Sequence, residues 1–184
     1  YLVEGYTDVI ALHMAGVPNV VASSGTSLTE TQIQLVSRFT NNISIVFDGD
    51  PAGIKAALRG IDIVLAKGLN VKIVPLPKGE DPDSYANKVG SSAFQSYLQA
   101  QAQDFIQFKT TLLLQAVKDD PIKKAGVIKE VVQSIAMIPD AVKRAVLIQQ
   151  CSQLLGIDEV VLTAEQNKLL HQQERGAQKK YKRS

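Results

Sequence analysis

The chain has 184 residues, of which 45% are hydrophobic and 21% are charged, and its formal net charge is +2 at neutral pH. This length suits one compact domain, or one domain with a small satellite. No apolar run approaches the roughly 20 residues of a membrane-spanning helix, and the single cysteine, Cys151, excludes an internal disulfide. We therefore expect a cytoplasmic protein without membrane contact.

The charge is divided unevenly along the chain. Residues 1–90 carry seven basic and nine acidic residues, whereas residues 91–184 carry thirteen and nine. The first half therefore lacks the basic character that is typical of nucleic-acid-binding domains. Seven of its nine acidic residues lie in three short segments, at residues 4–8, 48–50 and 80–83. Such confined like charge favours a bound cation.

The first 90 residues alternate between strand and helix patterns. Short β-rich runs occur at residues 2–3, 19–22, 43–47 and 71–74. Thr29 precedes Gln32 by a capping-box spacing, Pro51 suits a first helical turn, and Pro75 is expected to end the fourth run. Strands separated by helices of this length predict a parallel sheet with right-handed crossovers, which is an α/β fold.

After about residue 91 the pattern indicates helices only. The expected helices lie near residues 91–101, 104–118, 121–138, 140–155 and 158–174. One apolar stripe consists of Ile122, Val127, Val131, Ile135 and Ile138. A second consists of Val142, Val146, Cys151, Leu154 and Leu155, and the two stripes are expected to pack together. We therefore predict an α/β subdomain over residues 1–90 and a small all-helical subdomain over residues 91–184, with a basic tail at residues 179–183.

Carboxylates follow the predicted strands directly. Glu4 comes after the first run, and Asp48 and Asp50 flank Gly49 after the third. Ligands of parallel sheets bind beyond the carboxyl ends of the strands, so these side chains should meet at one edge. Oxygen ligands of this kind suit Mg²⁺ or Mn²⁺. The alternative is that Asp50 caps the helix that begins at Pro51.

Three further acidic residues have two possible roles. Asp8 either caps a helix or supports a metal ligand. Asp81 and Asp83 either contact the metal or belong to a solvated loop in which Asp83 caps the next helix. No cluster of cysteine and histidine accompanies them, so we expect no zinc site.

Two other features are candidates for contact with a nucleotide or a nucleic acid. Gly25 and Thr26 lie in a polar turn whose backbone N–H groups suit a phosphate. Lys55 and Arg59 lie one helical turn apart after the acidic pair, where the alternative is a solvated helix face.

Taken together, these segments resemble the bacterial DNA primases, and more broadly the toprim fold that topoisomerases and some nucleases share. The resemblance rests on residues 4–10, 25–26, 48–53 and 79–83. It implies metal ligation by Glu4, Asp48 and Asp50, with Asp48 shared between two ions. It also implies that Asp8, Asp81 and Asp83 are further acidic positions of the same site, and that Arg59 is a basic position near it.

The resemblance further implies the reaction and the partners. The reaction would be metal-dependent nucleotidyl transfer that joins ribonucleoside triphosphates into short RNA primers on a single-stranded DNA template, at the nucleoid in the cytoplasm. The chain begins with Tyr1 at the end of a strand, so we expect residues upstream to be missing. The resemblance implies that the family's zinc-binding, basic template-gripping and helicase-binding regions lie outside the chain. The replicative helicase would then be reached only through those regions, and the chain alone should make no primers.

The nearest alternative is a toprim-type nuclease that cleaves DNA. A phosphatase of the haloacid dehalogenase type also uses an Asp pair, but there the pair precedes the Ser/Thr loop, whereas here residues 24–26 precede Asp48. A phosphate-receiver module, with one acceptor Asp, fits Glu4 and the Asp48–Asp50 pair poorly.

Overall fold

The computed structural model of the protein describes residues 1–24, 27–117 and 120–181, with side chains as far as residue 176. Its contacts divide the chain into two compact units, Tyr1–Phe108 and Lys109–Ser184. The subdomain boundary that we expected near residue 90 stays a prediction, because a division by contacts does not show which segments fold independently. Within the described residues, none of the helices has both the length and the apolar character needed to span a bilayer.

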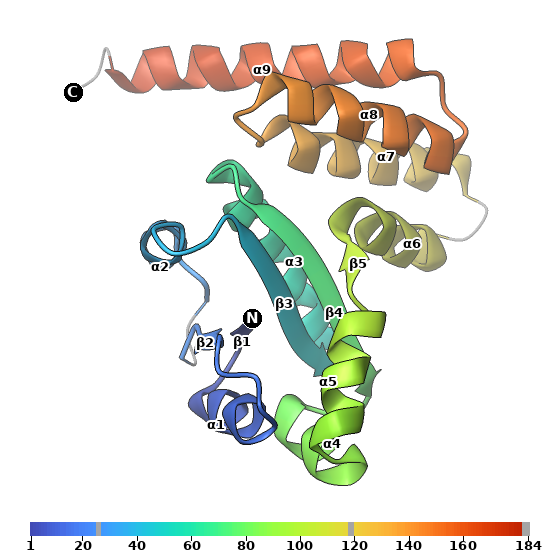
Figure 1. Ribbon diagram of the computed structural model, residues 1–184. Coiled ribbons are helices and arrows are strands. Elements are labelled where there is room, and N and C mark those ends of the chain that lie inside the picture. The colour runs from blue at the N-terminus through green and yellow to red at the C-terminus, as the bar shows by residue number, and fades with distance from the viewer. Residues whose placement is uncertain (25–26, 118–119, 182–184) are drawn as a thin grey trace. The chain divides into compact units, whose positions relative to one another are not determined.

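Five strands form one sheet in the described part of the first unit, in the order β2-β1-β3-β4-β5 (Figure 1). They are β1 (Leu2–Val3), β2 (Val21–Ala22), β3 (Asn42–Gly49), β4 (Asn70–Lys78) and β5 (Gln103–Asp104). The first four run parallel to their neighbours, which confirms the predicted α/β fold. β5 runs antiparallel to β4.

Helices cover both faces of this sheet. They are α1 (Tyr6–Met14), α2 (Glu30–Val36), α3 (Pro51–Ala66), α4 (Pro82–Val89) and α5 (Ser91–Ala100). α3 lies along β3 and β4 on one face and buries Ile61 and Val64 (Figure 1). On the other face, Val46 of β3 packs in a cluster with Leu12 of α1 and Phe94 of α5. The sheet core thus holds the strand ends in fixed positions.

Two strand predictions were wrong. Residues beyond 91 were expected to be helical only, but β5 pairs with Lys72 and Ile73. Two residues are too few to show the alternation by which strands are recognised. β4 also continues through Pro75 and Pro77 to Lys78. Because β5 pairs with β4 only near Lys72 and Ile73, the outer edge of β4 needs no N–H donor at the prolines.

The second unit contains the end of α6 and three further helices. α6 (Phe105–Val117) begins in the first unit, and α7 (Pro121–Ala136), α8 (Ala141–Leu155) and α9 (Glu159–Tyr181) follow. α7, α8 and α9 pack against one another. The all-helical character of this region is as predicted. The expected basic tail begins inside α9, and residues 182–184 lie outside the described residues.

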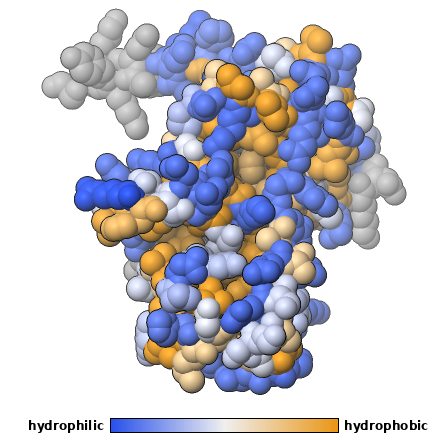
Figure 2. Space-filling view, in the orientation of Figure 1, coloured by the Kyte–Doolittle hydropathy of each residue, from blue (hydrophilic) through white to orange (hydrophobic). Residues whose placement is uncertain are grey.

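The two predicted apolar stripes differ in how many of their residues are buried. In the first, four of the five residues are buried, and Ile122 is exposed. In the second, Cys151 and Leu155 are buried with Ile148, whereas Val142, Val146 and Leu154 are exposed, so the second stripe was wrong. Ile148, Cys151 and Leu155 follow the i, i+3, i+7 spacing of one helix face, which the three exposed residues do not share. Exposed apolar residues interspersed with hydrophilic ones are visible in Figure 2.

The predicted capping box at Thr29 is present at the start of α2. The Gln32 N–H donates to the Thr29 hydroxyl over 3.2 Å, and the Thr29 N–H donates to the Gln32 side-chain oxygen over 2.9 Å. These bonds satisfy backbone donors that the helix itself leaves unpaired.

Replacing Thr29 with alanine should lower the free energy of unfolding of the first unit by about 1 kcal/mol, the usual cost of losing such a cap. Urea unfolding measures this loss. Thr29→Ser keeps the hydroxyl and should retain most of the stability. Equal losses in both variants would show that the cap is not the cause.

Candidate metal centre

The predicted acidic residues lie at the carboxyl edge of the sheet. Glu4 follows β1 directly, Asp48 is the second-last residue of β3, and Asp50 is the first residue after that strand. Asp81 follows β4 at the start of α4. The negative charges of Glu4, Asp8, Asp50 and Asp81 all act on Asp48, so strands that are distant in sequence bring these carboxylates together.

The turn between Asp48 and Asp50 requires glycine. The Gly49 N–H donates to the Glu80 carbonyl over 3.1 Å, and the Gly79 N–H donates to the Gly49 carbonyl over 3.4 Å. A Cβ atom at residue 49 would lie 2.1 Å from the Pro77 carbonyl oxygen, which is backbone and has no rotamer to change. The two carboxylates are therefore spaced by a turn that is packed against the end of β4.

Glu4 carries a buried oxygen without a partner. Within the part of the chain that the structure describes, no donor reaches the Glu4 Oε1 atom. Burial raises the pKa of the Glu4 carboxyl, and the nearby charges of Asp50 and Asp8 raise it further. A buried carboxylate oxygen without a donor is costly, so this position fits an oxygen-binding cation.

Asp48 is the most strongly perturbed carboxyl of the edge. It is half-buried, and its pKa is raised to about 6 from an ordinary value of 3.8. Burial is the largest cause, and the charges of Glu4, Asp8, Asp81 and Asp50 add to it. The charged form of Asp48 is therefore disfavoured until a positive charge is supplied.

Asp50 is the N-cap of α3. Its Oδ1 atom accepts a hydrogen bond from the Gly53 N–H over 2.7 Å. A Cβ atom at residue 53 would lie 2.6 Å from the Asp48 carbonyl oxygen, so glycine allows this helix to start close against the acidic turn. The cap that we considered as the alternative is present, but it uses one of the two carboxylate oxygens. Metal ligation by Asp50 stays a prediction.

Asp8 also combines capping with the acidic edge. Its Oδ2 atom accepts from the Gly5 N–H over 2.9 Å at the start of α1. Burial raises the pKa of the Asp8 carboxyl, the bond from Gly5 lowers it, and the charges of Asp81 and Asp83 raise it again. Asp8 thus lies within reach of the charges in the Asp81–Asp83 segment.

In that segment, the cap is Asp81 and not Asp83. The Asp81 Oδ1 atom accepts from the Ser84 N–H over 2.7 Å. Pro82 then takes the first helical position, which it suits because it lacks an N–H. Asp83 lies in the first turn and accepts from the Asn87 side-chain amide over 3.1 Å. Our expectation for Asp83 was wrong by two residues, because Pro82 shifts the helix start.

The carboxylates lie at one edge but do not form a closed ligand set. Among the side chains described up to residue 176, no three acidic, histidine or cysteine groups come close enough together to hold one ion. The available ligand atoms nevertheless fit a hard divalent cation, because all of them are carboxylate oxygens. The Glu4 Oε1 atom lacks a hydrogen-bond partner, and a cation would offset the repulsion among the carboxylates. Rotation of these side chains toward a bound cation would give the Glu4 Oε1 atom a partner and would reduce the repulsion among the carboxylates.

The candidate phosphate contacts are less defined. Lys55 and Arg59 are both exposed, one helical turn apart on α3, which is compatible with either alternative for them. Gly25 and Thr26 lie outside the described residues. Contact of these four residues with a nucleotide or nucleic acid stays a prediction.

A cavity beside the acidic edge was missed by sequence reasoning. It has a volume of about 340 Å³ between α3 and the sheet, and both Glu4 and Arg59 line it. Ala52, Ala56 and Gly60 leave this space on the α3 side. Their four-residue spacing was the available signal, since small residues at that period line one helix face.

Two parts of the chain match known families. Residues 1–86 match a family described as Toprim-like, and residues 107–159 match one described as the DnaB-helicase binding domain of primase. The chain is 33% identical over 164 residues to the DNA primase of Staphylococcus epidermidis, covering 89% of this chain and 27% of that protein. It spans about a quarter of the length of the curated relatives that it matches.

Solved structures agree with these matches. A DNA primase domain from Pseudomonas aeruginosa has a TM-score of 0.78 at 32% identity, covering 92% of this chain and 53% of that one. A DnaG primase catalytic domain bound to single-stranded DNA has a TM-score of 0.75 at 36% identity, covering 86% of this chain and 52% of that one.

The raised pKa of Asp48 predicts a pH dependence of stability in EDTA. Because the folded pKa exceeds the unfolded one, stability from protonated Asp48 is fully present below about pH 3.8 and is lost as the pH rises through about 6. Asp48→Asn removes this titration, so its melting temperature should fall less than that of the wild type between pH 4 and pH 7. Glu4 and Asp8 should leave a smaller dependence of the same sign. Parallel melting curves for the two proteins would contradict the assignment.

Proposed function

Because the chain belongs to the family of bacterial DNA primases, we propose that its acidic edge holds the divalent metal for RNA primer synthesis on a DNA template. The observation that carries the proposal is the crowding of carboxylates around Asp48, whose pKa is raised to about 6 by burial first and by these neighbouring charges second. A bound cation would lower the electrostatic cost of keeping these carboxylates charged at neutral pH. Since the chain spans about a quarter of its relatives, the activity belongs to the longer protein.

Each group at this edge has a distinct part in the proposed reaction. Mg²⁺ or Mn²⁺, when bound, supplies positive charge that orients the triphosphate and stabilises negative charge on the reacting oxygens. Glu4, Asp48 and Asp50 are the proposed ligands of this metal. Asp8, Asp81 and Asp83, which carry charge toward the same edge, support it directly or through water.

The basic residues of α3 have a different proposed part. Lys55 and Arg59 are exposed one helical turn apart beyond the Asp50 cap, so they are suited to contact phosphate groups of the nucleotide or the template. Gly25 and Thr26 are proposed as backbone contacts of the same kind. The carboxylates hold metal in this proposal and do not attack the substrate.

The partners that we propose are ribonucleoside triphosphates, a single-stranded DNA template and the replicative helicase, in the cytoplasm at the nucleoid. The similarity to a primase domain solved with single-stranded DNA supports the template. We expected helicase contact to lie entirely outside the chain, and the match of residues 107–159 to a helicase-binding domain does not support that expectation. We therefore propose that α6, α7 and α8 take part in helicase contact.

The metal proposal predicts a loss of binding when Asp48 is neutralised. Isothermal calorimetry with Mn²⁺ at neutral pH should detect binding to the wild type. Asp48→Asn should weaken it by roughly ten-fold or more, since a first ligand is lost. Glu30→Gln, which neutralises a carboxylate paired with Lys67 instead, serves as the control and should bind like the wild type. Equal affinity of Asp48→Asn and wild type would refute the metal site.

The isolated chain should make no primers, because it spans about a quarter of its relatives and its first 90 residues carry more acidic than basic residues. The assay follows labelled ribonucleotides on a single-stranded template with Mn²⁺, with the full-length Staphylococcus epidermidis primase as positive control. Template-dependent RNA from the isolated chain would contradict this prediction. Metal-dependent nicking of DNA would instead favour the nuclease alternative.

A further inference from the structure

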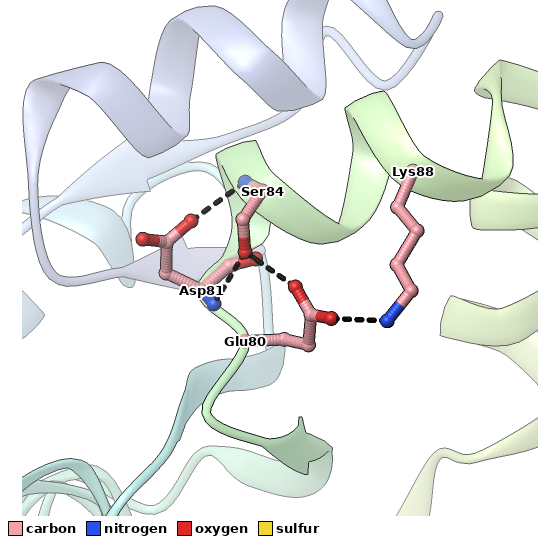
Figure 3. Close-up of polar contacts among 4 residues, drawn as sticks. All are labelled: Glu80, Asp81, Ser84 and Lys88. Carbon is pink, nitrogen blue, oxygen red and sulfur yellow. Dashed lines mark hydrogen bonds and ion pairs between the residues drawn. The ribbon is translucent and has the colours of Figure 1, made fainter.

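A compact polar network surrounds the start of α4 (Figure 3). The Ser84 hydroxyl donates to the Glu80 Oε2 atom over 2.7 Å and accepts from the Asp81 N–H over 3.0 Å. The Ser84 N–H donates to the Asp81 Oδ1 atom over 2.7 Å. The Lys88 Nζ atom pairs with the Glu80 Oε1 atom over 2.6 Å. Ser84 is the one of these four residues that contacts both Glu80 and Asp81 through its side chain.

This network is joined to the acidic turn through the main chain. The Glu80 carbonyl accepts from the Gly49 N–H, and Gly49 separates Asp48 from Asp50. Glu80 therefore connects the two: its carboxylate accepts from the Ser84 hydroxyl, and its carbonyl accepts from the turn between Asp48 and Asp50. Asp81, which Ser84 also holds, carries one of the charges that act on Asp48.

The network also separates the roles of two adjacent acids. Both carboxylate oxygens of Glu80 are already occupied, one by Lys88 and one by Ser84, and its side chain is only 16% exposed. The Asp81 side chain uses Oδ1 for the cap, and its Oδ2 atom is not needed there. Glu80 is thus suited to structure, whereas Asp81 retains an oxygen for a cation.

We propose that Ser84 is a positioning residue of the metal centre, whose hydroxyl joins the Asp81 main chain to the Glu80 carboxylate and so fixes Asp81 relative to the Asp48–Asp50 turn. The inference rests on the proposed metal function. It assigns Glu80 and Lys88 to the support of the loop and not to metal ligation. Ser84 acts through Asp81 and does not itself touch the metal or the substrate.

Ser84→Ala tests the proposal without a change of charge. Mn²⁺ affinity, measured by electron paramagnetic resonance at neutral pH, should fall roughly ten-fold, the lower end of the usual effect of removing a group that orients a ligand. Ser84→Thr keeps the hydroxyl and should restore the affinity. Ser96→Ala is the matched control, because the Ser96 hydroxyl bonds only the Ser92 carbonyl among the described contacts of α5. It should bind Mn²⁺ like the wild type.

A double-mutant cycle separates positioning from a general loss of stability. In the Asp81→Asn background, Ser84→Ala should cause no further loss of Mn²⁺ affinity, because Ser84 acts through Asp81. Melting in EDTA confirms that each variant is folded. An affinity of Ser84→Ala equal to wild type, or an equal loss in both backgrounds, would overturn the inference while leaving the metal centre in place. A wild-type protein that binds no Mn²⁺ would instead overturn the metal centre and this inference together.

Discussion

The parallel register of β1, β3 and β4 is the constraint on which the acidic edge depends. Leu2 lies beside Ile45, and Ile45 lies beside Ile73, so the three strands reach the same edge together. All three side chains are buried, and each fully buried aliphatic side chain stabilises the fold by roughly 1.5–3 kcal/mol. The core therefore holds the carboxylates beyond these strands near one another, even though their charges repel.

Three helix starts moderate that repulsion. α1, α3 and α4 all begin at this edge, and Asp8, Asp50 and Asp81 each accept a backbone N–H at one of them. Helix N-termini carry partial positive charge, which favours nearby carboxylates. Glu4 directly after β1 and Asp48 at the end of β3 cap no helix, and the pKa of Asp48 is shifted more than that of Glu4. Capping of α3 by Asp50 is therefore compatible with the proposed metal ligation, because the cap uses only one of the two carboxylate oxygens.

The sequence was sufficient to predict the elements that continue for several turns or residues with one period. The parallel sheet and four of five residues of the first helical stripe were found in this way, whereas the Thr29 cap and the α3 start at Pro51 were found from short motifs. Position along a strand also predicted that Glu4 and Asp48 would reach one edge. Sequence patterns were enough for these features because each of them is local, or follows from the topology of a parallel sheet.

The remaining features depend on tertiary contacts that no local pattern contains. β5 is too short for a period, and Pro75 fits within β4 only because β5 leaves that part of its edge open. Val142 and Val146 form an apolar spacing on α8, but α7 and α9 pack against a different face. The Glu80–Ser84–Lys88 network was missed because its i, i+4 and i+8 spacing crosses a helix start that Pro82 sets.

The contact between Gly49 and Pro77 has a consequence for how this site can change. The two acidic side chains of the turn are held apart by main chain that touches main chain, and any side chain at residue 49 would meet the Pro77 carbonyl oxygen. Mutation can exchange the chemical groups on either side of that glycine, but it cannot lengthen or fill the turn without separating β3 from β4. Evolutionary change or redesign of this edge is thus confined to the identity of the side chains at residues 48 and 50 and cannot alter their spacing.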